Sequence, residues 1–244
     1  NPINDAPTVA DISKNGLEDS DVTFSANDFT AYFNDVDTAD TLHKIKVIGL
    51  PANGQLKLNG LTVINGQEIL YADLDGLVFQ PDTNYFGSVT FNWNGNDGTV
   101  YAAANAVVTI NIASVNDIPL ANSDTFITCQ GNAVTQSIVG NDTDIDGTVD
   151  ASTVDLDPST IAEDKVFTVP GEGTYTVDAS GVLTFTPVAS FAGITTPINY
   201  RVKDNDSGLS GSASITITVN PRPTITASGA TTFTYGGSVT LTAS

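Results

Sequence analysis

The chain has one cysteine, no methionine, one tryptophan and one histidine among its 244 residues. A single cysteine excludes a disulfide bond within the chain. Without a CxxC motif or a second histidine, the sequence gives no support to a cysteine nucleophile. Any metal or ligand site is therefore expected to use oxygen-bearing side chains rather than cysteine or histidine.

Positive charge and long apolar runs are also scarce. Eight lysine and arginine residues stand against 28 aspartate and glutamate residues, which gives a net charge of -20 and a pI near 4.1. Such a chain is repelled by nucleic acid and by anionic membrane surfaces, and cations, above all Ca²⁺, are its natural partners. Because no run of about 18 apolar residues and no charged-then-apolar leader is present, we expect no direct membrane insertion and an interior or mature segment of a longer protein.

Three short Asn-x-x-Pro motifs divide the chain into intervals. They are "INDAP" at residues 3–7, "VNDIP" at residues 115–119 and the degenerate "VNPRP" at residues 219–223. Each interval has about the length of one β-sandwich, and proline stiffens each joint and bars it from a central strand. We therefore predict domains at residues 1–115 and 116–220, followed by the start of a third domain at residues 221–244.

Within the intervals, alternating apolar and polar residues predict short strands separated by Gly, Asn, Asp and Pro turns. In the first interval these strands are residues 21–25, 42–50, 54–58, 76–80, 88–94 and 105–113. In the second they are residues 124–129, 165–169, 173–178, 181–187, 198–204 and 214–219. Only residues 26–33 favour a helical turn. The predicted fold class is all-β, with tandem antiparallel β-sandwiches.

The last segment, residues 221–244, has just two strand-like pieces around a Gly-Gly turn. Two strands cannot bury a core of their own. We interpret the segment as the truncated start of a third, Ig-like domain. The alternative is a strand that pairs with a neighbouring molecule.

The stretch "GNDTDIDGT", residues 140–148, has an acid at every second position, namely Asp142, Asp144 and Asp146. This spacing matches the start of an EF-hand loop, in which alternate side chains converge on Ca²⁺. The twelfth position from Asp142 is Thr153 rather than the required glutamate, and the flanking residues do not favour helices. Any metal bound here must therefore take further ligands from elsewhere in the chain.

Acidic residues recur at similar distances after each joint. Asp35, Asp37 and Asp97 follow Asn4 and Asp5 of the first joint. In the second interval, Asn116 and Asp117 of the joint are followed by Asp144, Asp146, Asp204 and Asp206. Loops with this spacing can meet at one end of a sandwich, where several carboxylates repel one another unless a cation neutralises them. Because hard oxygen ligands select Ca²⁺, we predict calcium sites from these residues together with Asp142.

The NDxP joint and the DxD about thirty residues later (Asp35 and Asp37, or Asp144 and Asp146) resemble calcium ligands of cadherin repeats. So does the aspartate about ninety residues after the joint, Asp97 or Asp204, called the late aspartate below. The first interval is similar to bacterial cadherin-like adhesin repeats, the second to CshA-type fibril repeats, and the tail to Ig-like modules of bacterial surface proteins. The resemblance implies Ig-like or cadherin-like sandwiches in a calcium-stiffened segment of a long, secreted bacterial cell-surface adhesin. It implies as partners the neighbouring repeats, and surface glycans or other cells. At the joint, the implied ligands are Glu18, Asn116, Asp117, Asp144, Asp146 and Asp204.

This resemblance has two departures. The second interval has Gln130 where the early glutamate of the family would stand, and its outgoing joint "NPRP" has no acid. Both departures concern the same boundary. We therefore expect a calcium-dependent first joint and a second joint whose stiffness depends on Pro221 and Pro223 alone.

An enzyme is not indicated by the remaining reactive residues. His43 alternates with Thr41, Ile45 and Val47, which predicts a partly buried structural histidine on an apolar face. Cys129 alternates with Ile127 and is predicted to point into the core. No pair of acids stands out as a glycosidase pair.

A carbohydrate-binding module is the alternative to a spacer. Such modules bind sugars on exposed aromatic rings, but Trp93 alternates with Val89 and Phe91 and is predicted to lie in the core. Tyr32, Tyr85 and Tyr101 are the candidate surface aromatics.

Overall fold

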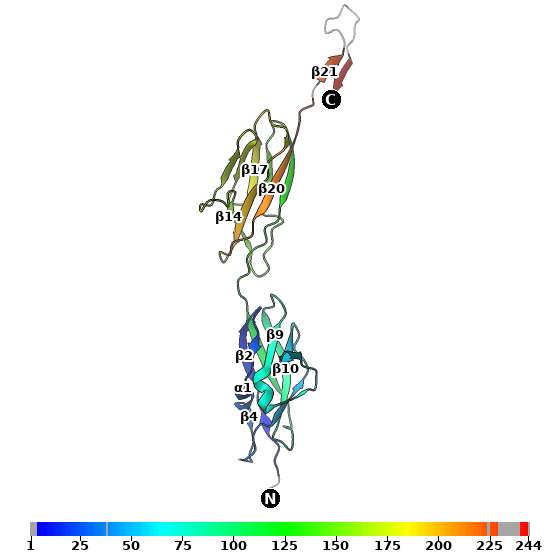
Figure 1. Cartoon of the computed structure of the whole chain (residues 1–244), viewed down its shortest axis with the longest axis vertical. Coiled ribbons are helices and arrows are strands. Elements are labelled where there is room, and N and C mark those ends of the chain that lie inside the picture. The colour runs from blue at the N-terminus through cyan, green and yellow to red at the C-terminus, as the bar shows by residue number, and fades with distance from the viewer. Residues whose placement is uncertain (1–3, 38, 224, 229–239, 244) are drawn as a thin grey trace, which may run out of the picture. The chain divides into compact units, whose positions relative to one another are not determined.

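The computed structural model describes residues 4–37, 39–223, 225–228 and 240–243. The chain divides into two compact units, Asn1–Val115 and Asn116–Ser244, which are called unit 1 and unit 2 below. Strands make up most of the regular structure of both units (Figure 1). In the part of the chain that the structure describes, no helix is long and apolar enough to cross a membrane.

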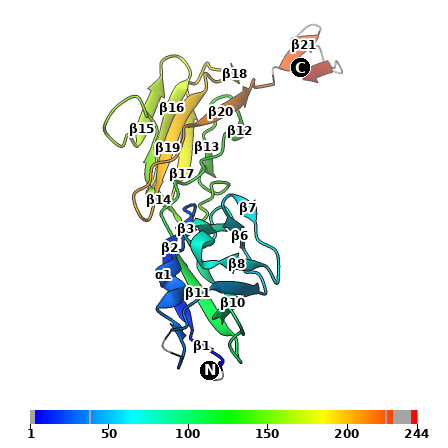
Figure 2. The same ribbon diagram turned by 60° about the horizontal axis from the view of Figure 1, so that its bottom comes forward.

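Unit 1 is a sandwich of two sheets. One sheet has the strand order β2 (Ile12–Leu17), β11 (Ala106–Ala113), β10 (Gly87–Asn96), β5 (Lys44–Ile48), β8 (Glu68–Leu70). The other has the order β3 (Val22–Thr23), β9 (Leu77–Pro81), β6 (Gly54–Leu58), β7 (Leu61–Thr62). A two-stranded ribbon pairs β1 (Thr8–Val9) with β4 (Phe33–Asn34). Figure 2 shows β2, β11 and β10 side by side, as the pairing requires.

The core of unit 1 is built from the inward residues of both sheets and from one short helix. Trp93 is fully buried and its ring lies edge-on to that of Phe29, with centroids 5.2 Å apart. Phe29 belongs to helix α1 (Ala26–Thr30), which begins after Ser25, where the Asp28 carboxylate accepts a hydrogen bond from the Ser25 N–H at 2.8 Å. Burial of each such side chain contributes about 1.5–3 kcal/mol. A 3₁₀ helix, η1 (Tyr71–Gly76), precedes β9.

Unit 2 repeats this plan. One sheet has the order β12 (Asp124–Cys129), β20 (Ala213–Asn220), β19 (Ile198–Asp204), β14 (Val149–Asp155), with β18 (Gly193–Ile194) also pairing with β20. The other has the order β13 (Val134–Ser137), β17 (Val182–Pro187), β16 (Gly173–Val177), β15 (Val166–Val169). Its core includes the rings of Tyr175 and Phe185, which are tilted by 44° to each other with centroids 4.6 Å apart. Strands β21 (Ile225–Ser228) and β22 (Thr240–Ala243) form an antiparallel pair.

The all-β sandwich class predicted from the sequence is confirmed, and each predicted strand and the helical turn are present. The structure adds strands that the alternation did not reveal, among them β2, β13 and β14. It also shows that one pair in each unit is parallel, β2 with β11 and β12 with β20. The first long strand of each unit thus lies beside the last one. The prediction of a third, Ig-like domain from residue 221 stays a prediction, since residues 229–239 lie outside the described residues.

Two burial predictions are wrong. His43 is exposed because Leu42 and Ile45, three residues apart, are both buried, so the alternation breaks before β5 begins. Cys129 is exposed too, because Phe126 rather than Ile127 packs against the core of unit 2. Strand β12 is at an edge of its sheet, and its outer face, with Ile127 at 69% exposure, carries apolar residues. The prediction that Trp93 belongs to the core is confirmed.

Candidate metal centre

In unit 1, the loops that follow β4 and β10 meet the segment that enters the sandwich. The Asn4 side-chain amide donates to Asp97 Oδ2 at 3.0 Å. The Asp5 N–H donates to Asp37 Oδ2 at 2.8 Å, and the Asp37 N–H donates to Asp35 Oδ1 at 2.9 Å. All five residues predicted from the acid spacing of the first interval are therefore linked at one end of the unit.

A sixth residue, Asp40, lies in this cluster and was not predicted from the acid spacing. One carboxylate oxygen each from Asp35, Asp37 and Asp40 lies within 4.8 Å of the others. Burial, and then repulsion from Asp35, Asp37 and Asp97, raises the pKa of Asp40. Asp40 is the last acid of "NDVDTAD", but unit 2 has valine at the equivalent position, residue 149, so this acid does not recur. The carboxylates of this cluster repel one another, as expected of a site for a cation.

Unit 2 repeats the same two hydrogen bonds. The Asn116 side-chain amide donates to Asp204 Oδ2 at 3.0 Å, and the Asp117 N–H donates to Asp146 Oδ1 at 3.2 Å. A backbone loop holds the other oxygen of Asp204, which accepts from the N–H groups of Asp206 and Gly208 at 2.8 Å each. The joint residues of both units are thus fixed to the DxD and to the late aspartate in the same way.

Glycine leaves room for neighbouring side-chain ends at two places in this part of unit 2. A Cβ at Gly208 would collide with Asp204 Oδ2 and would lie 2.7 Å from the Asn116 side-chain nitrogen. A Cβ at Gly147 would lie 2.8 Å from Asp144 Oδ2 and 2.6 Å from Asn205 Oδ1. Because both glycines leave room for carboxylate oxygens, the loops can bring these oxygens close together.

The late aspartates are held in their ionised form. Burial acts to raise the pKa of Asp97, but hydrogen bonds from Asn4 and from loop backbone N–H groups outweigh it, so the pKa is lowered. Burial also opposes ionisation of Asp204, and hydrogen bonds from Asn116 and the loop backbone lower its pKa in the same way. Both carboxylates are therefore charged at neutral pH, as a cation ligand must be.

Several carboxylate oxygens in the described part of the chain are buried without a hydrogen-bond partner. They include Asp35 Oδ2 in unit 1 and both oxygens of Asp144 in unit 2. Glu18, at the end of β2, is 2% exposed, and its Oε1 accepts from the Val115 N–H at 2.6 Å, whereas Oε2 has no partner. A buried carboxylate oxygen without a donor carries a large desolvation penalty, which a bound cation removes.

Gln130 occupies the position of Glu18 in unit 2. Its side-chain oxygen accepts from the Arg222 N–H at 3.3 Å, and its own N–H donates to Asn220 O, as that of Glu18 donates to Ala113 O. The strand pairing therefore aligns Asn220 with Ala113. The alignment of "VNPRP" with "VNDIP" is wrong by three residues, because β20 continues through Asn220. With the corrected alignment, Pro223 and Thr224 take the positions of Asn116 and Asp117, so no carboxylate stands there.

Asp142 and Asp206 have other partners. Asp142 accepts from the Tyr200 hydroxyl at 2.9 Å and from the Asn122 N–H at 2.8 Å. It lies near buried Asp124, whose pKa is raised to about 7 by burial and then by repulsion from Asp142. Asp206 accepts from the neighbouring Asn205 side chain at 2.9 Å. The contacts with Tyr200 and Asn122 give Asp142 a structural role in unit 2. Its prediction as a metal ligand stays a prediction.

The donor set fits Ca²⁺. The groups are carboxylate and amide oxygens, and Ca²⁺ takes about six to eight such ligands in flexible geometry. No histidine or cysteine takes part, and these side chains would be needed to favour a softer metal. The clusters fit a hard divalent cation by charge, by ligand type and by the unpartnered oxygens described above.

The sequence of unit 2 matches a known family. Residues 116–219 match the family model described as the surface adhesin CshA repetitive domain. The comparison with curated proteins gives no match. The family match thus covers one of the two units, and it coincides with the interval that was predicted to resemble a CshA-type repeat.

Solved cadherin structures share the fold of the chain. The EC1-2 fragment of human protocadherin-24 (form II) has a TM-score of 0.54 and 14% identity. The match covers 90% of this chain and 100% of that chain. The EC1-2 fragment of human mucin-like protocadherin has a TM-score of 0.49 and 12% identity over 88% of this chain and 98% of that chain. The match to Drosophila N-cadherin EC1-4 has a TM-score of 0.47 and 12% identity. It covers 89% of this chain and 50% of that chain, so this chain spans half of that structure.

At these identities, the structural similarity concerns the fold alone. The family match therefore indicates a surface-adhesin repeat in unit 2, and the structural similarity indicates a sandwich fold like that of cadherin repeats.

Proposed function

We propose that this chain is a calcium-stiffened repeat segment of a long, secreted bacterial cell-surface adhesin or fibril. The observation that supports this most is the repetition of one hydrogen-bond pair in both units. In each unit, a joint asparagine donates to the late aspartate and a joint backbone N–H donates to the second acid of the DxD. Turn aspartates that served only solubility would have no reason to repeat such a network.

At the first joint, we propose that ligands come from both sides of one peptide bond. The Glu18 carboxylate accepts from the Val115 N–H, and Val115 is bonded directly to Asn116, the first residue of unit 2. The proposed ligands are Glu18, Asn116, Asp117, Asp144, Asp146 and Asp204, with Asp206 at the edge of the set. In unit 1 the proposed equivalents are Asn4, Asp5, Asp35, Asp37 and Asp97. Asp40 is added to them because one of its carboxylate oxygens lies within 4.8 Å of Asp35 and Asp37.

Bound Ca²⁺ would neutralise the carboxylates, and the side chains that hold it would connect the linker to both units. Asn116 and Asp117 lie in the linker, so a cation that holds them to the DxD and to Glu18 removes the rotational freedom of that linker. Loss of the ion leaves carboxylates that repel one another and a joint whose motion is free. The proposed task is extension and display, in the extracellular space, next to neighbouring repeats of the same chain.

Carbohydrate binding is the second candidate, and the exposed ring of Tyr32, at 43%, is the observation in its favour. The other two predicted platform residues are already engaged. The Tyr85 hydroxyl donates to Ser88 O at 3.3 Å, and the Tyr101 hydroxyl donates to Glu68 at 2.7 Å. Lys44 also faces the Tyr101 ring, 5.6 Å from its centroid. Because only one of the three predicted rings is exposed, the spacer role is preferred.

A calorimetric Ca²⁺ titration of the whole chain, with EDTA as the metal-free reference, tests the proposal. We expect saturable binding that Asp97→Asn and Asp204→Asn each reduce, at unit 1 and unit 2 respectively. Gly208→Ala should act like Asp204→Asn, because its Cβ would displace the Asp204 carboxylate, whereas Gly211→Ala has open space and should bind normally. Absence of binding at millimolar Ca²⁺ would remove the proposal.

A further inference from the structure

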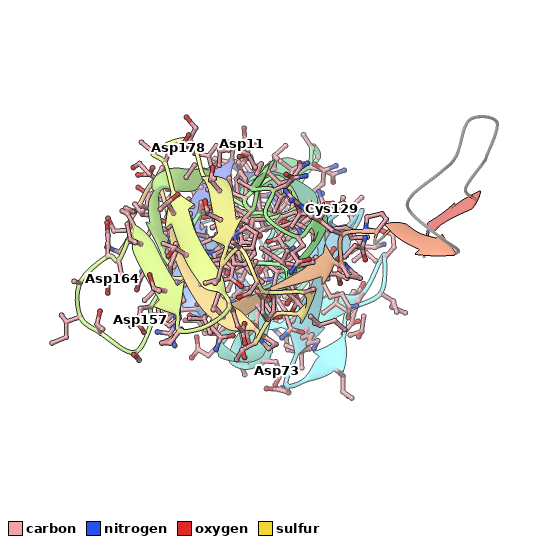
Figure 3. All side chains as sticks on the ribbon, turned by 90° about the horizontal axis from the view of Figure 1, so that it is seen from above. Asp11, Asp73, Cys129, Asp157, Asp164 and Asp178 are labelled. Carbon is pink, nitrogen blue, oxygen red and sulfur yellow. The ribbon has the colours of Figure 1, made fainter. Side chains whose placement is uncertain are left out.

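A groove of about 560 Å³ opens at the side of unit 2, between edge strand β15 and strand β19. The loop that joins β14 to β15 borders it, and this loop, which carries Asp157 and Asp164, extends away from the strands in Figure 3. The volume falls within the range of about 300–1,000 Å³ that is typical of ligand sites. None of the proposed calcium ligands lines this groove.

The groove exists because β14 leaves the sheet early. Its register with β19 shifts between Asp150 and Asp155, and the ladder reaches no further than Arg201, so Ile198–Tyr200 have β20 as their ladder partner and none from β14. Pro158, Pro170 and Pro197 border the opening. Because proline has no N–H to donate, these segments cannot close the gap by pairing as strands. The sandwich therefore stays open on this side.

The walls are mostly apolar, but they contain one cationic side chain. Leu156, Phe167, Val169 and Ile198 are among the lining residues, together with Arg201. The Arg201 Nε is buried and has no hydrogen-bond partner in the described part of the chain. A buried guanidinium nitrogen without an acceptor carries a desolvation penalty, which a hydrogen bond to an anionic ligand would remove.

The acid that is paired in register with Arg201 already accepts hydrogen bonds from the loop. Asp155, the register partner of Arg201, accepts from the N–H groups of Asp157 and Asp164, both at 3.0 Å. Asp157 itself accepts from the Ser159 N–H at 3.2 Å and from the Ser159 hydroxyl. These bonds hold the loop in shape, and no acceptor in the described part of the chain reaches the Arg201 Nε. The matching group in a ligand is a carboxylate, which arginine binds through paired hydrogen bonds.

The surroundings limit the ligand further. A net charge of -20 repels polyanions, so an acidic polysaccharide or nucleic acid is disfavoured, whereas one carboxylate beside Arg201 is not. Aliphatic and phenyl walls favour a large apolar group next to that carboxylate. The unpaired edges of β15 and of the first half of β19 suit an extended backbone, as in binding by strand addition.

We propose that this groove binds an extended peptide segment of another protein that presents one carboxylate beside a large apolar side chain, with Arg201 pairing with the carboxylate. The apolar side chain lies against Phe167 and Ile198. This would make unit 2 a docking module as well as a spacer. The proposal is independent of calcium, because no proposed calcium ligand takes part.

Nuclear magnetic resonance of the ¹⁵N-labelled chain tests it with two acetylated, amidated peptides, Val-Phe-Glu-Val and Val-Phe-Gln-Val. We expect the Glu peptide to shift the amide signals of Phe167, Thr196 and Asn199, in EDTA as in Ca²⁺. The Gln peptide should bind about tenfold more weakly, which corresponds to about 1.4 kcal/mol. Arg201→Gln should remove the preference for Glu, and Arg201→Lys should restore part of it.

Lys203→Gln is the matched control, since Lys203 lies two residues further along the same strand and pairs with Glu163 instead. It should bind both peptides as the parent chain does. Unchanged spectra away from the groove show that each variant is folded. Equal binding of the two peptides, an Arg201→Gln variant that keeps the preference, or shifts at the groove with a glucuronate disaccharide and none with the peptides would each overturn the proposal.

Discussion

Units 1 and 2 have the same acidic network where the chain enters them but differ where it leaves. Asn4 and Asp5 in one unit and Asn116 and Asp117 in the other make equivalent hydrogen bonds. At the exit, Glu18 in unit 1 has an unpartnered buried oxygen, whereas Gln130 in unit 2 is a neutral amide. The comparison shows that the entry network recurs in both units. Under the proposed function, a calcium site at a joint would also use the exit acid of the preceding repeat.

The largest expected effect is that of chelation. If only the native state binds Ca²⁺, then Ca²⁺ at about 100 times its Kd raises the free energy of unfolding by about 2.7 kcal/mol. Removal of Ca²⁺ with EDTA should therefore lower the melting temperature. In small-angle scattering, the Ca²⁺ form should have the longer maximum dimension, and Asp117→Ala should abolish that difference while both sandwiches stay folded. An identical maximum dimension with Ca²⁺ and with EDTA would mean that the joint is stiff for another reason.

The next effect concerns the exit residues. Glu18→Gln keeps an acceptor for the Val115 N–H but removes the charge, so Ca²⁺ affinity at the first joint should fall about tenfold, or about 1.4 kcal/mol. The reverse exchange, Gln130→Glu, should create no new site, because Pro223 and Thr224 offer no carboxylate. Calorimetric titration of both variants gives the answer. A new calcium site in the Gln130→Glu variant would contradict the distinction drawn between the two joints.

The smallest effect belongs to unit 2 alone. Asp124 has a pKa raised to about 7 by burial and then by Asp142, so the folded state binds its proton more tightly than the unfolded chain does. Its stabilising contribution is complete below the unfolded pKa, near 4, and is lost as the pH rises to about 7.

Asp124→Asn should therefore make unit 2 more stable at pH 8 by about 1 kcal/mol, the equivalent of one pKa unit, with little change at pH 4. Urea unfolding at the two pH values measures this. Asp11→Asn, a change in unit 1, is the control. An equal gain at both pH values would show that charge on Asp124 is not the cause.

The sequence predicted the sandwich fold because alternation is strong where one face of a strand is buried. It missed β2 because "ISKNGL" mixes lysine and glycine into the pattern, and β14 because its pairing shifts register midway. The acid spacing identified the entry network, since loops at one end of a sandwich recur at fixed distances. Asp40 occurs in one unit alone, and recurrence could not reveal it.

Other features depended on contacts that no local pattern records. The burial of Cys129 was predicted wrongly because alternation gives two faces but not which one meets the core. The three-residue shift of the second joint followed from the length of β20 rather than from the motif. Arg201 carried no sequence signal, since its meaning comes from an early end of β14 and from neighbouring acids that bond elsewhere.

The parallel pairing of the first and last long strands has a mechanical consequence. Tension along the chain pulls β2 from its start and β11 from its end, so the two parallel strands are pulled in opposite directions along their length. The six residue pairs between them, from Ile12 with Val108 to Leu17 with Ala113, are then loaded in shear and must fail together rather than peel apart one after another. Unit 2 has the same six-pair clamp between β12 and β20. A tether built from such units resists extension at each link.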